Sequence, residues 1–249
     1  MKANGGWQLL TQLSVQGDGH VNEDACGVRW PSAWVVDGAT PVLEQLGLPG
    51  ASDPQWYAAQ LSSLLAEHHD AGTARDVLRA ALTELDSLAQ TLVGDERVRF
   101  PSAAVMVATV HGGVLTFAWL ADCQAVAEVA DGSVVHVGTP GVDTSLTAEE
   151  HREARRLRNT PGQVWVARRE ADAADQAFTA ELTGVTRVVL ATDGGWLAVE
   201  RGVCTPEQLL KAASSTQGVL DVVMRLRSEQ ERLGESADDT TVLAVGLRI

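Results

Sequence analysis

The chain has 249 residues, 45% of them hydrophobic, and carries a formal net charge of −14 at pH 7. A chain of this length can bury a sizeable core as one domain. The acidic excess argues against nucleic acid as the main partner, because a phosphate backbone requires basic patches.

The sequence also argues against a membrane span, a disulfide framework and a zinc site. No apolar run approaches the ~20 residues needed to cross a bilayer, and the N-terminus lacks a signal-peptide core. We therefore expect a cytoplasmic protein. Cys26, Cys123 and Cys204 lie far apart. An odd number of separated cysteines favours reduced, mostly buried thiols.

The first part of the chain is predicted to form strands followed by two helices. Strands are expected at residues 9–15, 25–30 and 33–36. Asp53 is the predicted N-cap of the first helix, because Pro54 suits the first helical position. A second helix is predicted after Thr73, which has the capping-box spacing to Asp76, and should end at Gly94.

Short valine-rich segments, separated by Gly-Gly or Asp-Gly, then predict an antiparallel meander at residues 103–110, 114–120, 125–129 and 133–137. Thr147 and Glu150 open a short charged helix that extends to about Arg158. Further strands are expected at 164–168, 187–192 and 240–247, and helices from Thr205 and over 217–233. This order predicts an α+β domain whose antiparallel sheets are covered by helices.

Acidic residues stand at the ends of several predicted strands, and these positions are Glu23, Asp24, Asp37, Asp122, Asp193 and Asp238. A carboxylate at the end of a buried strand is held rigidly, and a following glycine such as Gly38 lets a backbone carbonyl approach a ligand. A set of oxygen donors without nearby Cys or His suits Mg²⁺ or Mn²⁺. An isolated Asp-Gly, such as Asp131-Gly132, is more often a turn, so the ordered set carries the inference.

That ordered set resembles the type-2C family of metal-dependent serine/threonine protein phosphatases over nearly the whole chain, in the form of a single-domain bacterial member. The matching motifs are Asn22-Glu23-Asp24, Val36-Asp37-Gly38, Pro101-Ser102-Ala103, Ala121-Asp122-Cys123, Thr192-Asp193-Gly194 and Asp238-Asp239-Thr240-Thr241. The resemblance implies one domain over residues 1–249, built as a sandwich of two antiparallel sheets with helices on both outer faces. It also implies a monomer that acts on phosphorylated proteins.

The resemblance further implies a site for two Mn²⁺ or Mg²⁺ ions, with catalytic roles for Asp37 and Asp193. Asp37 would bridge both ions, Asp193 and Asp238 would complete one site, and the Gly38 carbonyl would serve the other. The acidic pair Glu23 and Asp24 would act through water, and Asp122 would lie near a third, weaker position. Water activated by the two ions would attack phosphorus in line, without a covalent intermediate.

The chain departs from the family pattern at three places. Gly19 stands where many members carry a phosphate-binding arginine, and the adjacent His20 is a candidate substrate-binding residue. Ala39-Thr40 follow Asp37-Gly38 in place of further glycines or a histidine, so the general acid is unassigned. Cys123 replaces a serine. Two alternatives therefore stand beside an active phosphatase: a weakly active module that binds phosphoproteins or kinases, and a hydrolase of small phosphate esters.

Overall fold

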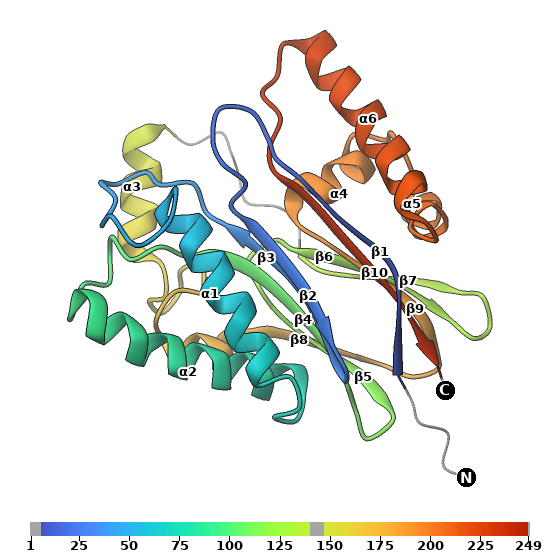
Figure 1. Cartoon of the computed structure of the whole chain (residues 1–249), viewed down its shortest axis with the longest axis horizontal. Coiled ribbons are helices and arrows are strands. Elements are labelled where there is room, and N and C mark those ends of the chain that lie inside the picture. The colour runs from blue at the N-terminus through green and yellow to red at the C-terminus, as the bar shows by residue number, and fades with distance from the viewer. Residues whose placement is uncertain (1–5, 140–146, 249) are drawn as a thin grey trace.

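The computed structural model describes residues 6–139 and 147–248. They form two five-stranded antiparallel sheets packed face to face (Figure 1). In spatial order, one sheet contains β1 (Gly6–Val15), β10 (Thr240–Arg248), β9 (Val185–Ala191), β6 (Gln124–Val129) and β7 (Val134–Val137). The other contains β2 (Asp24–Arg29), β3 (Ser32–Gly38), β4 (Ala103–His111), β5 (Val114–Leu120) and β8 (Phe178–Leu182).

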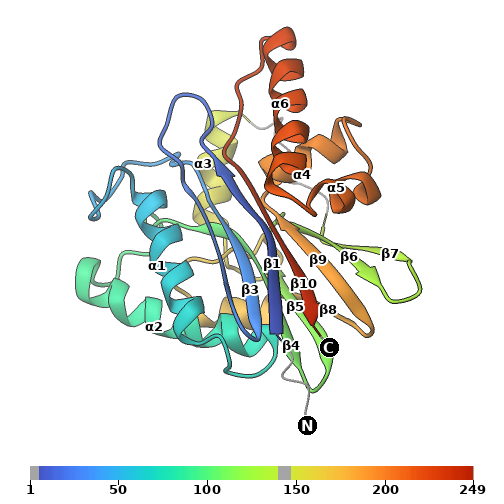
Figure 2. The ribbon, with the colours of Figure 1, turned by 45° about the vertical axis from the view of Figure 1, so that its right-hand side comes forward.

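Helices cover the outer face of each sheet, so the predicted four-layer α+β sandwich is confirmed. On the sheet that contains β3 lie α1 (Asp53–Glu67), α2 (Ala74–Val93) and the short 3₁₀ helix η1 (Ala171–Gln176). On the sheet that contains β10 lie α4 (Asp193–Glu200), α5 (Pro206–Ala212) and α6 (Thr216–Leu233). Figure 2 shows the two helical groups on opposite sides of the sheets. A further helix, α3 (Ala148–Leu157), is discussed with the site.

The core explains why the central strands show no polar alternation. Successive side chains of a strand point to opposite faces of its sheet. In β4, Met106 packs between the two sheets, whereas Val105 and Val107 pack under the helices. Both faces of the sheet at β4 are therefore shielded from water, and the sequence of this strand is a continuous run of apolar residues. Val126 and Ala127 of β6 divide in the same way between the two layers.

Two of the strand predictions are wrong. Residues 103–137 do not form one meander, because β4 and β5 pair in one sheet while β6 and β7 pair in the other. The chain crosses between the sheets at Ala121, whose φ of 63° turns it sharply. Residues 164–168 do not form a strand: only Ala103 and Ala167 form an isolated bridge. The edge of β5 is instead occupied by β8, which the sequence did not reveal.

The helix ends follow the sequence closely, with one correction. Capping boxes are present at Thr73 before α2 and at Thr147 before α3, as predicted. The N-cap of α1 is Ser52 rather than Asp53. Asp53 is the first helical residue, and its carboxylate accepts hydrogen bonds from the backbone N–H groups of the preceding loop, including that of Leu48 at 2.8 Å. No helix in the described part of the chain is long and apolar enough to span a membrane.

Candidate active site

The acidic residues selected from the sequence gather at one end of the sandwich. The antiparallel register of β2 and β3 places Asp24 directly opposite Asp37. Asp193 follows β9 as the first residue of α4, and Asp238 lies just before β10, which pairs with β9. Asp122 lies in the turn where the chain crosses from one sheet to the other. Strand ends from both sheets therefore supply carboxyl groups to the same region. This carboxyl cluster consists of Asp24, Asp37, Asp122, Asp193 and Asp238.

The pKa values of the central carboxyl groups show that they repel one another. Burial, followed by the charges of Asp193 and Asp24, raises the pKa of Asp37 well above its usual range. Burial also raises the pKa of Asp24 to about 7, against hydrogen bonds from Thr241 and Thr192. Burial and the charge of Asp122 raise the pKa of Asp193 to about 6. Because these carboxyl groups are buried close together, the charge on each disfavours ionisation of the others.

Two threonines fix Asp24 across the gap between the sheets. Thr192 donates its hydroxyl proton to Asp24 Oδ2 at 2.9 Å, and Thr241 donates its backbone N–H to Thr192 Oγ1 at 3.0 Å. Thr192 also donates its backbone N–H to the Thr241 carbonyl at 3.1 Å. The sheets are therefore joined by hydrogen bonds at the level of the carboxyl cluster.

The backbone at Gly38 passes too close to a neighbour for any side chain. A Cβ added there would lie 2.5 Å from the Glu23 carbonyl oxygen, which accepts the Gly38 N–H at 3.1 Å. This approach explains the glycine of the Asp37-Gly38 motif. It also places Glu23 beside the end of β3.

Glu23 provides an oxygen that lacks a protein partner. Its Oε1 accepts a 2.6 Å hydrogen bond from Ser52, the N-cap of α1. Its Oε2 is buried and makes no hydrogen bond among the described residues. Burial raises the pKa of this carboxyl group. A buried acceptor without a donor is costly unless a cation or water satisfies it.

The paired aspartates before β10 have different roles. Asp239 is buried and accepts the backbone N–H groups of Gly17 at 2.7 Å and Glu23 at 2.5 Å. It therefore holds the loop before β2 against the start of β10, which the sequence analysis missed. Asp238 is different, because its side chain is 57% exposed and lines a pocket. His20 lies beside this pair, with Nδ1 3.8 Å from Asp239 Oδ2 and Nε2 4.0 Å from Asp238 Oδ1.

The carboxyl cluster forms one wall of a pocket of about 250 Å³. Asp37, Asp122, Asp193 and Asp238 line this wall. Residues of α3 and of the segment after it also line the pocket, and these are His151, Ala154, Arg158, Gln163, Val164 and Val166. Of the described residues near the N-terminus, neither Gly19 nor His20 lines the pocket. Sequence analysis did not select Arg158, because nothing in its local context predicts that it faces the carboxylates.

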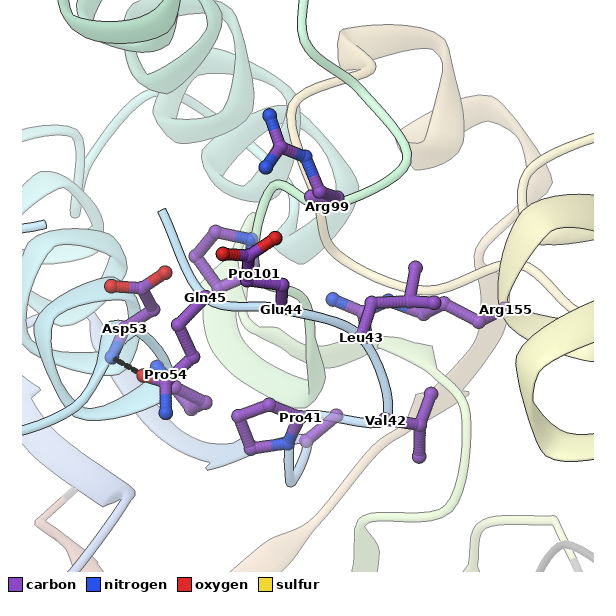
Figure 3. A pocket seen from close by; sticks show the side chains of 11 residues that line it. Pro41, Val42, Leu43, Glu44, Gln45, Asp53, Pro54, Arg99, Pro101 and Arg155 are labelled. Carbon is purple, nitrogen blue, oxygen red and sulfur yellow. Dashed lines mark hydrogen bonds between the residues drawn. The ribbon is translucent and has the colours of Figure 1, made fainter. Parts of the chain in front are cut away.

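A second, much smaller pocket lies beside this one, between the loop after β3 and Arg155 (Figure 3). In that loop Gln45 accepts the backbone N–H of Asp53 at 2.9 Å. The pocket volume is about 10 Å³, roughly enough for one water molecule. It does not offer room for a substrate.

The donor set fits divalent cations, although the side chains are not arranged around a common point. Within residues 6–139 and 147–248, no three His, Cys, Asp or Glu side chains form a ready metal-ligand group. Asp37, Asp122, Asp193 and Asp238 instead line one pocket together. All the donors are oxygens, and the Oε2 of Glu23 lacks a hydrogen-bond partner among the described residues. A cation would also reduce the repulsion between the carboxylates. These features suit Mg²⁺ or Mn²⁺.

No protein-family model matches the chain, and no curated protein matches it in sequence. Among solved structures, the chain is similar to the serine/threonine phosphatase PstP/Ppp of Mycobacterium tuberculosis. The TM-score is 0.64 and the identity 15%, over 98% of this chain and 99% of that chain.

Two further structures match over nearly the whole chain. The catalytic domain of the phosphatase PstP in complex with 2 manganese ions has a TM-score of 0.62 and 15% identity, with 99% of this chain and 100% of that chain covered. RsbX in complex with magnesium has a TM-score of 0.56 and 11% identity, with 98% and 100% covered. The resemblance seen in the motifs is thus confirmed at the level of the fold: the chain has the fold of the type-2C metal-dependent serine/threonine phosphatases.

Proposed function

We propose that the chain is a metal-dependent phosphatase that hydrolyses phosphoserine and phosphothreonine in proteins. The observation that carries the proposal is the convergence of carboxyl groups from both sheets on one pocket, with pKa values raised by burial and by one another. Titratable groups perturbed in this way, and placed in a cleft, are typical of functional sites. The similarity to PstP, whose structure contains manganese ions, supports a divalent cofactor.

In this proposal Asp37 would serve both cations. Asp193 and Asp238 would help to hold one of them, and the Gly38 carbonyl would help to hold the other. Bound there, Mn²⁺ or Mg²⁺ would lower the pKa of water and neutralise charge on the phosphoryl oxygens. Protein groups that fix the carboxylates are already present, because Thr192 holds Asp24 and backbone hydrogen bonds join the strand ends.

The remaining acidic residues play supporting roles. Glu23 and Asp24 would bind water at the second cation, and the unpaired Oε2 of Glu23 is free to accept a hydrogen bond from it. Asp122 would lie near a third, weaker cation position. Ser52 orients Glu23 from the N-terminus of α1. We further propose that the protein acts as a cytoplasmic monomer on phosphorylated protein substrates.

The test pairs metal binding with turnover. Calorimetric titration should show Mn²⁺ binding to the wild type, and p-nitrophenyl phosphate should be hydrolysed only when Mn²⁺ or Mg²⁺ is present. Asp37→Asn should lose both. Asp131→Asn is the matched control, because Asp131 also precedes a glycine but only caps an exposed hairpin turn through Ser133.

The outcomes separate the alternatives. Full activity after exhaustive EDTA treatment would exclude the two-cation proposal. Metal binding without turnover, together with binding of phosphopeptides, would favour the regulatory module. A panel of phosphopeptides and small phosphate esters, compared by kcat/KM, distinguishes a protein phosphatase from a hydrolase of small esters.

A further inference from the structure

The large pocket is lined by carboxyl groups and also by a positively charged side chain. Within the described residues, Arg158 is the one arginine or lysine among those that line it. Arg158 follows the last residue of α3, and His151, seven residues earlier, lines the same pocket. Ala154 lines it as well. Residues of α3 and its C-cap therefore share one pocket with the carboxyl cluster.

Ser102 positions Arg158 relative to the ends of the strands. Arg158 Nη1 donates a hydrogen bond to Ser102 Oγ at 3.1 Å. The Ser102 carbonyl accepts the backbone N–H of Ala39 at 2.9 Å, and Ala39 follows Asp37 and Gly38 directly. The Arg158 guanidinium group and the backbone that follows Asp37 are thus both hydrogen-bonded to Ser102.

A second arginine anchors α3 and leaves Arg158 available. Arg155 is buried and donates to Ser102 Oγ at 2.6 Å and to the Phe100 carbonyl at 3.0 Å. Nearby, Arg168 is paired with Glu170 at 2.6 Å. Arg158 forms no salt bridge with any described residue. Its one side-chain hydrogen bond among the described residues is the one to Ser102, so its other donors have no acceptor within that part of the chain.

The local charge favours an anion next to Arg158. Burial and the neighbouring cations Arg158 and Arg168 lower the pKa of Arg155 to about 9. Burial and Arg168 likewise lower the pKa of Arg158, and the charge of Asp122 opposes this. Three guanidinium groups near one another are mutually destabilising, and a bound dianion would relieve them. A guanidinium fork matches the oxygens of a phosphoryl group.

We propose that Arg158 binds the phosphoryl group of the substrate, the task for which Gly19 provides no side chain. The inference rests on the proposed phosphatase function, and it assigns substrate binding to α3 rather than to the N-terminal loop. Because the contact is to the phosphoryl group, it serves every phosphomonoester in the same way, whatever the leaving group.

The test compares Arg158→Ala with Arg156→Ala. Arg156 lies two residues away, and its side chain is 57% exposed and pairs only with Glu153 at 3.4 Å. The Kd of inorganic phosphate is measured by calorimetry on Mn²⁺-saturated protein, and KM is measured for p-nitrophenyl phosphate and a phosphopeptide. In Arg158→Ala we expect the phosphate Kd and both KM values to rise about ten- to hundredfold. Arg156→Ala should match the wild type.

Two further variants and one further measurement control for the type of contact, for folding and for metal binding. Arg158→Lys keeps the charge without the fork and should recover part of the phosphate affinity. Arg158→Gln keeps a donor for Ser102, so it replaces Arg158→Ala if that variant fails to fold. The Mn²⁺ Kd should not rise in any variant, because removing a positive charge near Asp122 does not oppose binding of a cation.

Each contrary outcome has a distinct meaning. An unchanged phosphate Kd in a folded, Mn²⁺-binding Arg158→Ala would overturn the assignment of Arg158 and leave the proposed function standing. A higher KM for the phosphopeptide alone would indicate that Arg158 contacts the peptide rather than the phosphoryl group, and it would also overturn the assignment. A wild type that neither binds Mn²⁺ nor hydrolyses either substrate would overturn the proposed function, and the assignment with it.

Discussion

Replacing Asp24 with asparagine would measure how strongly the carboxyl cluster destabilises the metal-free protein. The pKa of Asp24 is raised from 3.8 to about 7, first by burial and then by nearby carboxylates such as Asp239. Between these two pH values the folded state binds more protons than the unfolded state. The free energy of unfolding therefore falls as the pH rises through this range.

The size of the effect follows from the two pKa values. At about 1.4 kcal/mol for each pH unit, a shift from 3.8 to about 7 costs on the order of 4 kcal/mol at neutral pH and about 1–2 kcal/mol at pH 5. Asparagine cannot ionise, and its carbonyl oxygen can still accept the hydroxyl of Thr192. We therefore expect Asp24→Asn to stabilise the metal-free protein, by about 2–4 kcal/mol at pH 7.5 and by less at pH 5. The pKa of Asp193, raised to about 6, shares neighbours with that of Asp24, so the two effects are not additive.

Urea unfolding in EDTA at pH 5, 6 and 7.5 provides the assay. The difference between Asp24→Asn and the wild type removes the contributions of His20 and Glu23, because these groups titrate in both proteins. With saturating Mn²⁺ the order should reverse, since the wild type binds the cation more tightly. A variant that is less stable than the wild type in EDTA at pH 7.5 would refute the reasoning. So would a difference that does not change with pH. Either result would make Asp24 a structural acceptor for Thr192 and Thr241.

Three other predictions follow from single positions. Cys123 is buried, and burial together with the charges of Asp37 and Asp122 raises the pKa of its thiol well above the usual range. We expect no rapid labelling in the folded protein and retained activity in Cys123→Ser, and loss of activity on mild oxidation that Cys123→Ser prevents would contradict this. Arg169 is buried and donates to Asp86, Gln90 and the carbonyls of Gly94 and Glu96. Arg169→Met should lower the unfolding free energy by about 3–5 kcal/mol, and a loss below about 1 kcal/mol in urea unfolding would show that these bonds contribute little. Gly19 has a φ of +82° and open space around its Cα, so Gly19→Arg should fold with a loss of about 1–2 kcal/mol. When Gly19→Arg is combined with Arg158→Ala, the new guanidinium group should lower the phosphate Kd relative to Arg158→Ala alone. An unchanged Kd in this double variant would show that the loop does not approach the phosphate.

The sequence by itself determined the features that depend on neighbouring residues. The capping boxes at Thr73 and Thr147 were predicted correctly, because a cap involves hydrogen bonds within four residues. The bounds of β5 were also predicted correctly, and the order of the acidic motifs indicated the fold. The assignment of Asp37 and Asp193 as metal ligands is still a prediction, although both residues line the same pocket.

Features that depend on distant partners required the tertiary structure. The composition of residues 164–168 suits a strand, but only Ala167 finds a partner, Ala103 at the start of β4, while β8 pairs along the edge of β5. The crossing at Ala121 could not be predicted either, because the turn looks the same whether the next strand pairs in the same sheet or in the other.

The residues around the carboxylates show the same limit. Arg158 contacts Ser102 and Arg169 contacts Gly94, partners that lie 56 and 75 positions away. Asp239 reaches Glu23 across 216 positions. Local sequence encodes which residues can form a helix or strand and which side chains carry charge. Which charges meet is decided by sheet pairing and packing, because these bring together segments whose separation along the chain carries no local signal.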